Sequence, residues 1–263
     1  MIRFEMSKEY IGRGASKGLQ RGILAYHEGD MIVDEGMGIG VCALQSGGYT
    51  YFSTIGKIEM DSNVIKVSCR IDSMLTRSIF GIKSRLVTRF LEYLTTNIYM
   101  KSEKLQNLFL AIGAFLRRIF NIQTGFEKVG SRADVSVAYV IGEYDVQVSI
   151  NCNSHVENAR IFVMNELGGS VFSRALNEGI ICSPPSGWQR FREGARLYSP
   201  ERGISFTMSE KNVPKGVKSS LYWGREVAKG YNWAGFESML AAENGEVKGY
   251  EYKIEFKRED DPY

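Results

Sequence analysis

The sequence has little of the chemistry on which metal and thiol centres depend. Its 263 residues include two histidines, four cysteines and five prolines. The cysteines show no C-x-x-C spacing, and with two histidines beside them a zinc site is not expected. Four cysteines also fall short of a disulfide framework, so we predict reduced thiols that are buried as small apolar side chains. No metal and no cofactor are predicted.

A glycine-rich stretch at residues 11–18, IGRGASKG, has the glycine spacing of a loop that binds phosphate. Such a loop follows a buried strand and opens a helix, which brings backbone N–H groups onto the anion. Here one short alternating segment precedes the stretch, strand and turn patterns follow it, and the G-K-[ST] ending of a P-loop is missing. We interpret residues 11–18 as a glycine-rich turn, not as a nucleotide site.

Excess charge of either sign is also lacking. The formal net charge is +3, and the densest basic cluster is the pair Arg117-Arg118. A nucleic-acid groove needs a longer basic stripe, so no nucleic-acid partner is predicted. Charged residues recur from Arg3 to Glu9, which leaves no apolar core for a signal peptide, and a cytoplasmic location is the expectation.

Glycine and aromatic residues are plentiful, with 28 Gly, 14 Tyr and 14 Phe. Apolar and polar side chains alternate with period two in residues 64–72, 145–152 and 250–257. This alternation is typical of antiparallel strands that have one buried and one solvated face. We therefore predict a mainly β protein, built as a large antiparallel β-sandwich whose strands are joined by glycine turns.

One segment, residues 84–121, breaks the alternation. Its apolar residues recur with the period of a helix, first as Leu86, Phe90, Leu91, Leu94 and Ile98, then as Leu105, Leu108, Ile112, Phe115, Leu116 and Ile119. We predict a helical hairpin inserted between two β halves, residues 1–82 and 123–263, of a single β-sandwich domain that spans residues 1–263.

The second helix of this hairpin has no charged residue from Leu105 to Leu116. That run is shorter than the about 20 residues that cross a bilayer, so no transmembrane segment is predicted. Three interpretations remain open for the helix. It packs beneath the sheet, it forms a homodimer interface, or it lies on a membrane surface. The cations that flank the run and would be attracted to such a surface are Lys101, Lys104, Arg117 and Arg118.

The C-terminal half gathers aromatic and charged residues, and all three tryptophans fall between positions 188 and 233. Aromatic rings can stack on the apolar faces of sugar rings, while carboxylates and guanidinium groups bind the hydroxyls. The residues predicted to bind a saccharide are Trp188, Trp223, Trp233, Tyr222 and Arg225, and the catalytic candidates are Glu226 and Glu237. The alternative is that these aromatic residues stabilise the core or rim of the sandwich.

The remaining groups of potentially functional residues match known motifs less well. The serine elbow G-x-S-x-G is absent, and His27 and His155 have no catalytic signature around them. The Gly168-Gly169 pair suits a bulge or a close backbone approach, which would let Asn165 and Glu166 just before it face a cleft.

The sequence supports two hypotheses for the function of the protein, which belong to different classes. The first is a protein that binds or modifies a carbohydrate, which requires at least two of the tryptophans and a carboxylate to line one accessible concavity. The second is a non-enzymatic assembly protein that uses residues 84–121 for homo-oligomerisation or for contact with a membrane surface. It requires an exposed stripe of Leu105, Leu108, Ile112 and Phe115. Whether the protein is an enzyme stays open at the level of sequence.

Overall fold

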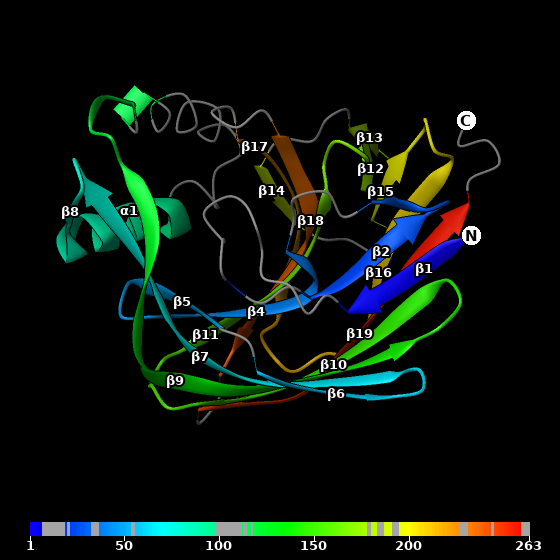
Figure 1. Ribbon diagram of the computed structural model, residues 1–263, viewed down its shortest axis with the longest axis horizontal. Helices are drawn as coiled ribbons and strands as arrows, with labels where there is room; N and C mark the ends of the chain where they lie inside the picture. Colours follow the sequence, from blue (N-terminus) through cyan, green and yellow to red (C-terminus); the bar gives the residue numbers. More distant parts are fainter. Residues whose placement is uncertain are drawn as a thin grey trace.

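The chain forms one curled antiparallel sheet with a helix at one end (Figure 1). The computed structural model describes residues 1–6, 19, 22–32, 37–53, 56–97, 112, 115–116, 118–177, 180–182, 187–190, 195–226, 231–242 and 245–258. These ranges contain nineteen strands and one helix. The prediction of a mainly β, antiparallel protein is therefore confirmed.

The elements follow one another along the chain as strands, one helix and more strands. Before and including the helix they are β1 (Ile2–Met6), β2 (Ile23–His27), β3 (Asp30–Met31), β4 (Gly38–Ser46), β5 (Tyr49–Ser53), β6 (Lys57–Asp61), β7 (Val64–Ile79), β8 (Ile82–Lys83) and α1 (Arg85–Asn97). After the helix they are β9 (Gln123–Ile141), β10 (Asp145–Ser154), β11 (Arg160–Gly168), β12 (Arg174–Asn177), β13 (Ile180–Cys182), β14 (Gly187–Arg190), β15 (Arg196–Ser199), β16 (Ile204–Asn212), β17 (Lys218–Glu226), β18 (Tyr231–Ala241) and β19 (Glu246–Arg258).

Strand β4 connects the two arms of the sheet. On one side it pairs with β11, and the arm continues through β18 and β17 to β14. On the other side it pairs with β5, and that arm continues through β7, β9, β10 and β19 to β16. The predicted sandwich of two separate sheets is not confirmed, because the described strands join in one hydrogen-bonded sheet.

The two arms face each other across a buried core, and polar side chains connect them there. The Tyr139 hydroxyl on β9 donates to the Gly40 carbonyl on β4 at 3.1 Å, and the Tyr252 hydroxyl on β19 donates to Asn165 Oδ1 on β11 at 2.7 Å. Asn165 Oδ1 also accepts the Gly40 N–H at 3.0 Å. Gly40 has a φ of 82°, and a Cβ there would overlap the Tyr139 ring, so the close approach of the arms requires glycine.

The strands with period-two alternation fold as expected. In β19, Tyr250, Tyr252, Ile254 and Phe256 are buried in the core, and Glu251 and Lys257 point outward. The β4–β5 hairpin turns at Gly47 and Gly48, whose φ values of 60° and 80° lie in the region that favours glycine.

The predicted helical hairpin is not confirmed, because α1 is the one complete helix among the described residues and most of the predicted second helix lies outside them. Ser84 caps its first turn, since Ser84 Oγ accepts the Val87 N–H at 3.3 Å. Of the predicted second helix, Leu105 and Leu108 lie outside the described residues, whereas Ile112 and Phe115 are exposed. Within the described part of the chain, no helix has both the length and the apolar character that crossing a membrane requires.

Candidate functional site

Strand register places a row of site candidates on one face of the sheet. Residues that pair directly on neighbouring antiparallel strands have side chains on the same face. Across β14, β17, β18, β11 and β4, successive partners are Trp188, Tyr222, Gly235, Glu166 and Gly38. Two neighbouring aromatic positions and a carboxylate therefore share this face, with Gly235 between Tyr222 and Glu166.

The rows on either side add residues to the same face. In one direction, Trp233 on β18 pairs with Gly224 on β17 and with Gly168 on β11. In the other direction, Glu237 pairs with Ser220 and also with Met164. We call the set Glu166, Trp188, Tyr222, Trp233 and Glu237 the acid–aromatic face. For Trp188 and Trp233, the assignment to this face rests on their backbone positions in β14 and β18. Glu226 pairs with Tyr231 near the end of β17.

The remaining two predicted residues occupy the other face. Trp223 is 7% exposed and belongs to the core, and its β18 partner is the buried Ala234. Arg225 is two residues further along β17 and therefore has the register position of that same face. Because successive residues of a strand alternate between faces, Tyr222 and Trp223 cannot both contribute to one site. Trp223 and Arg225 are not part of the site proposed below.

Glu166 is held in a strongly desolvated position. Gly235 lies between Glu166 and Tyr222 in the row, and its lack of a side chain lets the Tyr222 hydroxyl reach Glu166 Oε2 at 3.2 Å. Burial raises the pKa of Glu166 to about 7, while hydrogen bonds from Tyr222 and from the Met37 backbone oppose that rise. Glu166 as a whole residue is half-buried. A carboxyl group in this state can donate or accept a proton near neutral pH.

The Tyr222 hydroxyl donates to Glu166 and resists ionisation. Burial, then the negative charges of Glu166 and Glu237, raise the pKa of its hydroxyl well above the ordinary value. Glu237 is the diagonal neighbour of Glu166 on the adjacent strand, a relation in which backbone positions are about 7–8 Å apart. The face thus combines two carboxylates with a phenol that remains protonated.

A groove of about 840 Å³ lies elsewhere, over β7, β9, β10 and β19. Its acids have basic partners: Lys128 Nζ lies 3.6 Å from Asp72, and His155 Nε2 lies 3.1 Å from Asp134. Burial raises the pKa of Cys69 to about 11 and that of Cys152 to about 12, which makes both thiols poor nucleophiles. The described residues that line the groove include no aromatic side chain, so the acid–aromatic face is the stronger candidate.

The aromatic and acidic residues of the C-terminal half predict Tyr222, Trp188, Trp233 and Glu237 as site residues, whereas Glu166 is not among the predicted catalytic residues. The available signal was the Gly168-Gly169 pair just after Glu166. Nothing local in the sequence shows that Gly235 on another strand lies opposite Glu166, or that Tyr222 lies beyond it.

No protein-family model matches this sequence, and no curated protein matches it. A structure from Escherichia coli, provisionally assigned as an aldose 1-epimerase, is 11% identical with a TM-score of 0.42 and aligns over 92% of this chain and 93% of its own. A glycoside hydrolase family 97 enzyme from Pseudoalteromonas is 9% identical with a TM-score of 0.42, over 98% of this chain and 34% of its own. A 4-alpha-glucanotransferase from Thermococcus litoralis is 11% identical with a TM-score of 0.36, over 84% and 27%.

Proposed function

We propose that this protein binds a saccharide on the acid–aromatic face and transfers a proton to or from it through Glu166. The observation that carries the proposal is the Glu166 carboxyl group, which has a pKa raised to about 7 by burial and accepts a hydrogen bond from Tyr222 at 3.2 Å. A carboxyl group whose pKa lies near the working pH suits general acid–base catalysis.

The other residues of the face supply what a sugar requires. Trp188 and Trp233 occupy positions on this face where indole rings would stack on the apolar faces of sugar rings. Glu237 provides a second carboxylate, and pairs of carboxylates with different environments are the usual means of acid–base chemistry on sugars. In this proposal Glu166 in its protonated form donates to a sugar oxygen, and Glu237 accepts hydrogen bonds from hydroxyl groups or activates water.

A thermal-shift screen against mono- and oligosaccharides tests the binding. A ligand at 100 times its dissociation constant stabilises the native state by about 2.7 kcal/mol, which is a shift of several degrees for a chain of this size. We expect one sugar class to produce such a shift and Trp233→Ala to abolish it.

The matched control is Tyr144→Ala, since Tyr144 is an exposed aromatic residue in the turn between β9 and β10. This variant should keep the shift. A shift that survives in Trp233→Ala, or a broad panel in which no sugar produces one, contradicts the proposal.

A further inference from the structure

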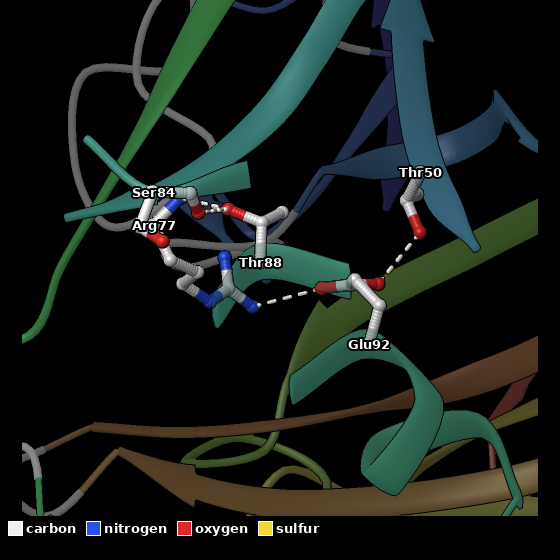
Figure 2. Close-up of polar contacts among 5 residues, drawn as sticks. All are labelled: Thr50, Arg77, Ser84, Thr88 and Glu92. Carbon is white, nitrogen blue, oxygen red and sulfur yellow. Dashed lines mark hydrogen bonds and ion pairs between the residues drawn. The ribbon is translucent and has the colours of Figure 1, made fainter. Parts of the chain in front are cut away.

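Polar side chains lie between helix α1 and strands β5 and β7 (Figure 2). Thr88 and Glu92 are its buried residues on that side. Thr88 Oγ1 accepts the Arg77 N–H at 2.8 Å and donates to the Ser84 carbonyl at 2.9 Å. Glu92 accepts hydrogen bonds from Arg77 Nη2 at 3.1 Å and from Thr50 Oγ1 at 2.7 Å. These contacts fix which side of α1 faces β5 and β7.

The opposite side of α1 is apolar and exposed. Leu86, Phe90 and Tyr93 are 82%, 61% and 59% exposed. Their spacing of four and then three residues places them in one stripe along the helix, which we call the α1 stripe. Turning the helix to bury this stripe would leave Glu92 without the partners that Arg77 and Thr50 provide, so the polar contacts hold the stripe outward.

The hairpin that leads into α1 is also apolar at its surface. Phe80 and Ile82, at the β7–β8 turn, are 63% and 74% exposed. The Phe80 ring meets the Phe120 ring edge-on, with centroids 6.2 Å apart, and the Phe80 N–H donates to the Phe120 carbonyl at 3.1 Å. In Figure 1, β8 and α1 lie together at the end of the molecule away from both labelled termini. Several large apolar side chains are therefore exposed in this one region, which points to a binding surface.

The charges around the stripe indicate what covers it. Lys83, Arg85 and Arg89 are exposed, and Arg85 also reaches Glu127 at 3.2 Å. The single acidic residue of α1 is Glu92, which is buried in its ion pair with Arg77. An apolar helix face flanked by cations suits a negatively charged lipid surface, whereas a second copy of this chain would bring the same cations together. We propose that the α1 stripe docks the protein onto an anionic membrane surface.

Vesicle co-sedimentation tests this docking. We expect the protein to bind vesicles of phosphatidylcholine mixed with phosphatidylserine, to bind vesicles of phosphatidylcholine alone at least about 10-fold more weakly, and to be released by salt. Phe90→Ser should weaken binding to the mixed vesicles by about 10-fold or more, because it removes the central apolar contact. Arg89→Glu should weaken it too, by reversing a flanking charge.

The matched control is Met60→Ser, which alters an exposed apolar residue on β6 and should leave vesicle binding unchanged. Phe90 is exposed, so the unfolding midpoint of Phe90→Ser should match that of the unaltered protein. Equal binding of Phe90→Ser and the unaltered protein would overturn the proposal, as would no binding at all. A dimer in sedimentation equilibrium that Phe90→Ser separates would overturn it in favour of a second copy as the partner.

Discussion

Replacing Glu166 with Gln is expected to increase the free energy of unfolding by about 3 kcal/mol at about pH 9 and to change it little at about pH 4. Burial raises the pKa of Glu166 from its ordinary 4.5 to about 7. The folded protein therefore holds this proton more tightly than the unfolded chain, and stability is lost as pH rises from the ordinary pKa through the folded one. Glutamine keeps the shape of the protonated carboxyl group and does not ionise, so its advantage grows over the same pH range.

Denaturant unfolding of the two proteins between these pH values measures the effect. Glu255→Gln is the control of opposite sign, because a hydrogen bond from Lys253 lowers the pKa of Glu255. That carboxylate stabilises the fold above its ordinary pKa, so Glu255→Gln should be destabilising at neutral pH and less so in acid. A difference between Glu166→Gln and the unaltered protein that stays constant with pH would show that the Glu166 pKa is not raised.

Arg77→Met is expected to lower the free energy of unfolding by about 3–5 kcal/mol, because it leaves the Glu92 carboxylate buried without its cation. The two side chains are 15% and 8% exposed, and Arg77 Nη2 lies 3.1 Å from Glu92 Oε1. Removing the guanidinium also removes one contact between α1 and β7, while the Arg77 N–H can still donate to Thr88 Oγ1. The unfolding midpoint should fall by roughly 10 °C.

The double variant Arg77→Met with Glu92→Met separates the ion pair from packing. Replacing both members of a buried pair by apolar residues is often neutral, so the double variant should recover most of the lost stability. If Arg77→Met unfolds at the same temperature as the unaltered protein, the pair does not hold α1 in place. If the double variant is as unstable as Arg77→Met, packing rather than charge explains the loss.

The sequence predicts strands well where one face is polar. In β19 the alternation of Tyr250, Tyr252 and Ile254 with charged residues gives both the strand and its buried face. In β11, Phe162, Val163 and Met164 are apolar in succession, so the sequence gives a strand but not which residues share a face with Glu166. The Glu166–Gly235–Tyr222 row comes from pairing between distant strands, which no local pattern contains.

For the helix, the sequence predicts the secondary structure but not which side of the helix faces the core. Periodicity correctly predicts a helix and an apolar stripe through Leu86 and Phe90, but a stripe is ordinarily expected to face the core. In the structure Leu86 and Phe90 are exposed, whereas Leu91 and Leu94 of the same predicted stripe are half-buried. The helix has this orientation because Arg77 and Thr50, from two strands, contact Glu92 on its polar side. Thr50 and Arg77 lie outside the helix, 42 and 15 residues before Glu92, so the orientation of α1 depends on tertiary contacts that helical periodicity does not encode.

We propose that Glu166 transfers a proton in a saccharide site, and a carbon-13 NMR titration of the Glu side-chain carboxyl groups tests this proposal directly. We expect one carboxyl resonance with a midpoint at about 7, absent from Glu166→Gln and displaced when the sugar found by thermal shift is added. A Glu166 midpoint near the ordinary value of 4.5, or one that no sugar displaces, would contradict this proposal.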